Sequence, residues 1–218
     1  MTILVEAAVD SLDDALAAVE GGADRLELCA NLAVGGTTPD PALIATVLAR
    51  VAIPVVAMIR PRDGSFVYTS AEIARMKRDI EMALNLGAAG LVFGVLDSMN
   101  RIDVAATQSL VAAAGGRRAT FHRAFDRTPD LLAAADTLIS LGVSRVLTSG
   151  GAATASDGTG ALASLVEHVG GRLEILAGGG VRAANVRDIV LGTGVREVHA
   201  RCERDAGRIR AIKTALAE

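Results

Sequence analysis

Several residue types are scarce in this sequence. It has no tryptophan, one tyrosine, four phenylalanines and two cysteines in 218 residues. The cysteines, Cys29 and Cys202, lie far apart, so we expect buried free thiols rather than a disulfide. Only two lysines occur, Lys77 and Lys213, and both fall in helical patterns. This argues against imine chemistry, because no predicted strand carries a lysine amine.

Long apolar runs and clusters of positive charge are also missing. The net charge is −3, and no basic run occurs. We therefore expect no nucleic-acid partner, since phosphate binding needs clustered Lys and Arg. The apolar stretches are too short to cross a bilayer, which takes about 20 residues. The first residues have neither a basic segment nor a long hydrophobic one, so we expect a cytoplasmic protein without membrane contact.

What the sequence does have is a repeated pattern, in which a helix ends at glycine, a small residue follows and an apolar strand begins. It occurs at residues 22–28 (GADRLEL), 87–93 (GAAGLVF), 142–147 (GVSRVL) and 194–199 (GVREVH). Glycine after a helix adopts the left-handed conformation that ends it. Each occurrence therefore predicts a short connection from a helix to a strand.

Completing this pattern predicts eight strands separated by amphipathic helices. The strands are expected near residues 3–9, 24–29, 54–60, 90–95, 118–123, 144–149, 172–177 and 196–200. Helix starts are indicated at Ser11, Thr38 before Pro39, Ser70, Asp103, Thr128 before Pro129, and Arg182. This alternation predicts an α/β fold, a (β/α)8 TIM barrel, as a single domain over residues 1–218. An open doubly wound sheet also alternates in this way, but the glycine-rich phosphate loop is absent after the first strand.

Side-chain alternation along the strands predicts an unusually polar barrel interior. If Leu26 and Leu28 face the helices, Arg25, Glu27 and Cys29 face inward. The same count turns inward Glu6, Ala8, Met58, Arg60, Thr120, His122, Glu197 and His199. Buried charges must pair or serve a ligand. We favour a structural ion-pair layer for Glu6 and Arg25, and a functional role for Glu27 and His122.

The loops after the strands supply further candidate ligand-binding residues, because barrels act at the carboxyl ends of their strands. The candidates are Asn31, Arg60, Arg62, Arg123, Asp126, Thr148, Gly150, Gly179 and Gly180. Arginines grip carboxylates or phosphates, and glycine amides approach anions closely. Solvated arginines, tight turns and residues that hold their own loops are the simpler readings. All five aromatic residues fall in or just after strands three to five, which suits an apolar pocket wall or core.

The strings GADRLELCANL (22–32), GGTTP (35–39), MIRPR (58–62), TFHRAFD (120–126), LTSGG (147–151), GGGVR (178–182) and EVH (197–199) resemble the CutC family over nearly the whole chain. The resemblance implies a cytoplasmic TIM barrel, a homo-oligomer and a part in copper homeostasis, with Cu(I) bound through cysteines. Family members with two cysteines place one on the first strand, where this chain has Ala8. Cys29 remains, and Met58, His122 or His199 could complete the metal ligands.

Two functional hypotheses follow. In the first, the chain binds cytosolic Cu(I), with Cys29 and Met58 as metal ligands. In the second, it is a barrel enzyme without copper, in which Glu27, His122 and His199 are catalytic and a small polar or anionic metabolite is the partner. In a variant of the second, Glu27, His122 and His199 hold a harder metal such as Zn²⁺ or Mn²⁺.

Overall fold

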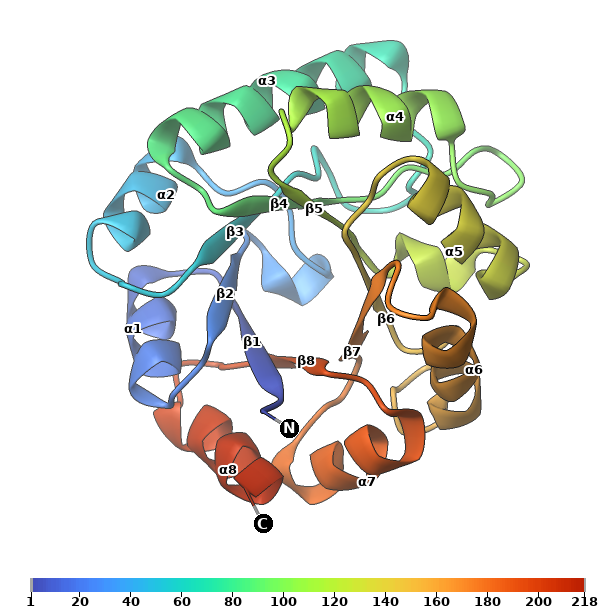
Figure 1. The fold of residues 1–218 in the computed structure, drawn as a ribbon. Helices are drawn as coiled ribbons and strands as arrows, with labels where there is room; N and C mark the ends of the chain where they lie inside the picture. Colours follow the sequence, from blue (N-terminus) through green and yellow to red (C-terminus); the bar gives the residue numbers. More distant parts are fainter. Residues whose placement is uncertain (1, 218) are drawn as a thin grey trace.

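The computed structural model describes residues 2–217 and forms a closed barrel of eight parallel strands, in sequence order around the ring (Figure 1). The closed TIM barrel is confirmed, and every strand lies within one residue of its predicted range. The strands are β1 (Leu4–Val9), β2 (Arg25–Leu28), β3 (Val55–Met58), β4 (Gly90–Phe93), β5 (Arg118–Phe121), β6 (Arg145–Thr148), β7 (Glu174–Gly178) and β8 (Glu197–Arg201).

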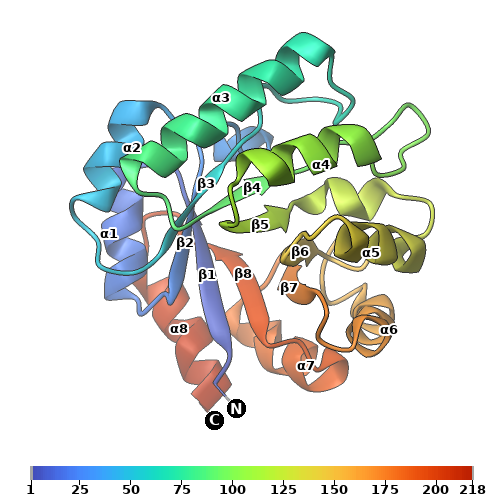
Figure 2. The same ribbon diagram turned by 45° about the horizontal axis from the view of Figure 1, so that its top comes forward.

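Eight α-helices surround the ring of strands (Figures 1 and 2). They are α1 (Leu12–Glu20), α2 (Pro41–Leu48), α3 (Ser70–Leu86), α4 (Val104–Ala113), α5 (Leu131–Ser140), α6 (Thr159–Val169), α7 (Ala183–Thr193) and α8 (Ala206–Ala217). Two short 3-10 helices follow β2 and β5, namely η1 (Leu32–Val34) and η2 (Arg123–Arg127). Among the described residues, no helix combines the length and the apolar character needed to span a membrane.

Local side-chain caps fix where the helices begin. Ser11 accepts a hydrogen bond from the backbone of Asp14 at the start of α1, as predicted. The predicted starts of α2 and α5 are wrong by two residues. Asp40 caps α2 and Asp130 caps α5, because an aspartate side chain accepts the free amides of the first turn. The hydroxyl of Thr128 instead donates to the carbonyl of Phe125 in η2.

The two faces of the barrel strands have different surroundings. Outward side chains such as Val5, Leu26 and Val198 pack against the helices in one large apolar core. Many inward side chains are polar, as the alternation predicts. A small apolar cluster, Cys29, Val56, Met58 and Val92, also lies in the interior, and Ala8 and Leu147 line its cavity. The register places Glu6 beside both Arg25 of β2 and His199 of β8. Residues far apart in sequence therefore meet inside the barrel.

Candidate functional site

The lower layer of the barrel interior is a network of ion pairs. Arg25 donates from Nε to the carboxylate of Glu6. It also donates from Nη2 to Oε2 of Glu197, at 2.5 Å. Arg145 donates to Oε1 of Glu197 at 3.1 Å and to the hydroxyl of Thr120 at 3.2 Å. All five side chains are buried. Glu6 and Arg25 thus take the structural role expected of them. Arg145 was missed, although alternation along its strand would have turned it inward.

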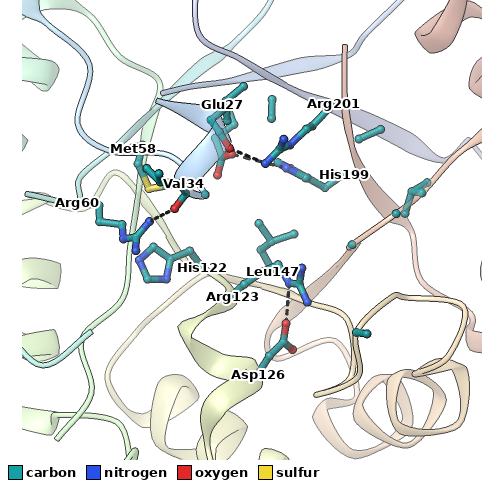
Figure 3. A pocket seen from close by; sticks show the side chains of 18 of the residues that line it. Glu27, Val34, Met58, Arg60, His122, Arg123, Asp126, Leu147, His199 and Arg201 are labelled. Carbon is teal, nitrogen blue, oxygen red and sulfur yellow. Dashed lines mark hydrogen bonds and ion pairs between the residues drawn. The ribbon is translucent and has the colours of Figure 1, made fainter. Parts of the chain in front are cut away.

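Above this layer, the carboxylate of Glu27 contacts the side chains of Cys29 and His199, and Figure 3 shows Glu27 beside His199. The Sγ of Cys29 lies 3.6 Å from Glu27 Oε2, and Nε2 of His199 lies 3.7 Å from the same oxygen. The other ring nitrogen of His199, Nδ1, lies 2.8 Å from Oε1 of Glu6. Cys29, Glu27, His199 and Glu6 are therefore linked in one continuous chain of polar contacts. Its upper part lies at the mouth of the barrel.

These contacts shift the pKa values of all four groups. Burial alone raises the pKa of Glu6, but the hydrogen bond to His199 and the charge of Arg25 outweigh it and lower that pKa to about 2. Burial raises the pKa of Glu27. For His199, burial lowers the pKa, but the carboxylates of Glu27 and Glu6 raise it above its ordinary value. Burial and the charge of Glu27 raise the pKa of the Cys29 thiol well above its ordinary value.

Of the three predicted catalytic residues, His122 does not share the polar contacts that link Glu27 and His199 in the described residues. Its Nδ1 accepts the backbone N–H of Ala124 at 3.2 Å, and its ring packs against Phe66 at a centroid distance of 5.0 Å. Burial and the nearby Arg60 lower its pKa to about 3, so the ring is neutral with its proton on Nε2. In residues 2–217, the partner of Glu27 is His199 and not His122. The acid–base roles of Glu27, His122 and His199 stay predictions.

The side chains that could bind Zn²⁺ or Mn²⁺ differ from the expected set of Glu27, His122 and His199. In the described part of the chain, the group of acidic and imidazole side chains able to hold an ion is Glu6, Glu27 and His199, with ligand atoms within 4.8 Å of one another. His122 does not belong to it. Since Glu6 is already paired with Arg25, a hard cation there would have to displace an existing ion pair.

The soft ligands lie beside Glu27, beneath the loop that contains η1. Cys29 and Met58 pack together, and both are almost fully buried. Gly36 has a φ of 85°, and a Cβ added there would lie 3.1 Å from the Cys29 Sγ and 3.5 Å from the Met58 Cε. The loop therefore closes directly over both sulfur atoms. Cys202, the other free thiol, lies in the outer core, away from this position.

Arginines and an asparagine hold this loop and the next one. Arg60 donates from Nη1 to the carbonyls of Val34 at 3.0 Å and Gly36 at 2.9 Å, and it lies over the ring of Phe66. Asn31 donates to the hydroxyl of Thr37 at 3.0 Å. Arg62 binds Glu72 at 2.6 Å and the carbonyl of Val67, and it does not line the barrel cavity. Asn31 and Arg62 thus hold their own loops, the simpler of the two readings.

The carboxylate of Asp126 fills the loop after β6. It accepts hydrogen bonds from the hydroxyl of Thr148 at 2.5 Å and from the amides of Ser149 and Gly151 at 3.1 Å. Arg123 binds its other oxygen at 2.8 Å. The amides of the loop after β6, which we expected to bind a ligand, therefore already bind the carboxylate of Asp126. Gly150 serves the turn, because a Cβ there would lie 2.7 Å from the carbonyl of Gly158.

The loop after β7 is different, since Gly179 and Gly180 do line the cavity. Of the aromatic residues, Phe66 is the one that lines it, while Phe93, Phe121 and Phe125 belong to the outer core and Tyr68 packs against Arg62. Of the two alternatives left open for the aromatic residues, pocket wall applies to Phe66 and core to Phe93, Phe121 and Phe125. Apolar clustering in sequence does not distinguish the two faces of a barrel strand.

The profile of the CutC family matches residues 3–203. The chain belongs to the CutC family. A human relative, the copper homeostasis protein cutC homolog, is 46% identical over 206 residues, which cover 94% of this chain and 76% of the relative. A family protein CutC of Xanthomonas campestris is 46% identical over 90% of this chain and 82% of its own length.

Among solved structures, CutC from Streptococcus agalactiae has a TM-score of 0.86 and 39% identity, over 91% of this chain and 98% of that one. A thiamine phosphate pyrophosphorylase of Pyrococcus furiosus, at 14% identity and a TM-score of 0.66, shares the fold alone.

Membership in this family makes the position of Ala8 informative. Ala8 lines the cavity and pairs in register with Glu27 on β2 and with Arg201 on β8. A cysteine at this position would therefore lie next to the Glu27 carboxylate. This chain offers a single inward thiol, that of Cys29.

Proposed function

We propose that this chain takes part in copper homeostasis by binding Cu(I) as its cargo at the mouth of the barrel. Cys29 supplies the thiolate, Met58 the thioether and His199 an imidazole. The observation that carries the proposal is the packing of Cys29 and Met58 in one buried cluster, with the thiol 3.6 Å from Glu27. The names of the human and Streptococcus relatives, which refer to copper homeostasis and to CutC, support it.

The donor set suits a soft monovalent ion. Cu(I) prefers thiolate, thioether and imidazole ligands over carboxylates. The surroundings of the two sulfur atoms, Val56 and Val92, are apolar and favour a low-charge centre over a hydrated divalent one. Metal binding requires the thiol to lose its proton, and Oε2 of Glu27 is the nearest base to receive it. Glu27 thus has a defined role as a proton acceptor without being a metal ligand.

The test is a competition titration with Cu(I) and a colorimetric chelator under reducing conditions. We expect one tightly bound copper per chain, lost in Cys29→Ser and weakened in Met58→Leu. Cys202→Ser is the matched control, because it removes the other buried thiol from a position outside the site. Equal chelator competition by the wild type and Cys29→Ser would refute the proposal.

We also propose that the protein works in the cytoplasm as a homo-oligomer. Free cysteines, here Cys29 and Cys202, are typical of proteins of reducing compartments, which supports the first part. Leu191 on α7 is 74% exposed, and a contact with a second copy through α7 would cover it. Sedimentation velocity of the wild type and Leu191→Glu tests the oligomer. A monomeric wild type would refute it.

A further inference from the structure

The cavity at the mouth of the barrel is much larger than a metal ion requires. Its volume is about 970 Å³, and it extends from Glu27 and His199 across to the loops after β5 and β7. Clefts of this size hold small organic molecules. The copper site uses only one edge of this space, so the remaining walls need a separate explanation.

Those walls carry an excess of positive charge. The arginines that line the cavity are Arg60, Arg123, Arg127, Arg182, Arg201 and Arg208. Four of them, Arg60, Arg127, Arg182 and Arg201, form no ion pair with any acid in the described part of the chain, residues 2–217. Arg60 and Arg201 are held by carbonyls of the η1 loop, so Arg127 and Arg182 are the free ones within those residues. Unpaired guanidinium groups around a concave surface attract anions and grip their oxygens in pairs.

The loop after β7 offers free backbone amides on the same side. Gly179 and Gly180 have φ values of 104° and 74°, and the N–H groups of residues 179–181 donate to no other described residue. They precede the N-terminus of α7, whose dipole favours negative charge. The guanidinium of Arg123 lies against this loop, with Nη1 3.3 Å from the position of a Cβ on Gly179. The loop after β6 provides a comparison, because its amides already bind the carboxylate of Asp126.

Two buried polar atoms on other walls of the cavity have no partner. Within the described residues, Oε1 of Glu27 accepts no hydrogen bond and Nε2 of His122 donates none. Both side chains are nevertheless buried, since Glu27 is 2% exposed and His122 is 4% exposed. Figure 3 shows the carboxylate of Glu27 directed into the space between the labelled side chains. Buried polar atoms are normally paired, so these two atoms indicate where a ligand supplies the missing hydroxyl or carbonyl group.

We propose that the cavity binds a small hydroxylated anion, whose anionic group lies on the amides of residues 179–181 beside Arg123 and Arg182, and whose hydroxyl or carbonyl oxygens meet Glu27 and His122. Phosphate and carboxylate share this chemistry. The site does not depend on copper, because none of the residues that hold the anionic group is a proposed copper ligand. Its failure and that of the copper proposal are therefore distinguishable.

The experiment is calorimetric titration of the full chain with glycerol 3-phosphate, glycerate, inorganic phosphate, acetate and glycerol. We expect either glycerol 3-phosphate or glycerate to bind, and the one that binds shows whether the site recognises phosphate or carboxylate. We expect no binding of glycerol, which has the hydroxyl groups but no charge. Arg182→Gln should weaken that binding about tenfold, the loss of one charge-assisted hydrogen bond. Arg187→Gln is the matched control, since it removes an exposed arginine of the same helix that does not line the cavity.

A second variant tests the other end of the ligand and does not affect the arginines. Glu27→Gln should weaken binding of the hydroxylated anion about tenfold. Binding of its counterpart without alcohol groups, inorganic phosphate or acetate, should be unchanged. Cys29→Ser should abolish copper binding and preserve binding of the anion. The proposal fails if neither hydroxylated anion binds, if glycerol binds equally well, or if Arg182→Gln and Arg187→Gln weaken binding to the same extent.

Discussion

The Cys29 thiol and the Glu27 carboxylate lie 3.6 Å apart, on the same face of β2 at the mouth of the barrel. The pair places a proton donor and a proton acceptor in contact where soft metal ligands also meet. Glu27 in turn is 3.7 Å from His199, so a proton leaving the thiol has a route along polar groups.

Copper binding is expected to depend steeply on pH. Burial and the charge of Glu27 raise the pKa of Cys29 well above its ordinary value, so the free protein holds the thiol protonated at neutral pH. Each Cu(I) bound then releases one proton, which Glu27 accepts and passes on to the solvent, and the apparent affinity rises about tenfold per pH unit below that pKa. Chelator competition at pH 6, 7 and 8 measures this slope. A pH-independent affinity would show that Cys29 is not a ligand.

A second thiol at position 8 is expected to tighten copper binding. The side chain of Ala8 lines the cavity next to Glu27 in register, so Ala8→Cys places sulfur beside the site. We expect the Kd for Cu(I) to fall by about tenfold or more, equivalent to ~1.4 kcal/mol. Ala7→Cys is the control, because Ala7 points to the outer core of the same strand. Equal affinities of the two variants would contradict the proposed position.

Glu6 is expected to contribute stability that is lost in acid. Its pKa in the fold is about 2, below its ordinary value of 4.5, so its contribution is complete above pH 4.5 and declines as the pH falls toward 2. At pH 7, Glu6→Gln should lower the free energy of unfolding by about 3 kcal/mol, because Arg25 and His199 lose a buried partner. Urea unfolding at pH 7 and pH 3 measures the difference.

Glu20→Gln is the control for this measurement, since Glu20 is 71% exposed in its surface pair with Arg210 and should contribute little at either pH. If Glu6→Gln were no more destabilising than Glu20→Gln at pH 7, the ion-pair layer would not stabilise the barrel.

The two inward histidines are expected to carry different charges. His122 has a pKa of about 3 and stays neutral with its proton on Nε2, whereas the pKa of His199 is raised by two carboxylates. Ring ¹⁵N chemical shifts recorded between pH 5 and pH 8 should therefore show no titration of His122 and a protonated His199 at the lower pH values. Titration of His122 within that range would contradict the buried position of its ring.

The eight strands and the polar interior could be predicted from sequence because each depends on local information. Glycine after a helix marks where a strand begins, and alternation assigns Glu27, Met58 and His199 to the inside. The height of each residue along the barrel depends instead on the stagger between strands, which alternation does not contain. The sequence therefore groups Glu27 with both His122 and His199, whereas the structure places it beside His199, which pairs in register with Glu6.

Loop interactions were harder to predict for a similar reason. Whether the amides after β6 are free depends on the side chain of Asp126, which reaches them from the loop after β5. The side chain of Arg62 likewise turns away from the cavity to Glu72. The residue types predicted anion binding in the loops after β3 and β6. In both loops the anion bound is a carboxylate of the protein itself, Glu72 or Asp126, and only the three-dimensional contacts show this.

At the proposed copper site, the η1 loop over Cys29 would make the rate of metal exchange independent of the metal affinity. Arg60 binds the loop at Val34 and Gly36, and Arg201 binds it at the carbonyl of Leu32 at 2.6 Å. An ion bound beneath Gly36 leaves only after these hydrogen bonds open. If Cu(I) binds as proposed, its residence time would be set by loop kinetics and its equilibrium affinity by the sulfur ligands, so the ion would stay for long periods without an extreme dissociation constant.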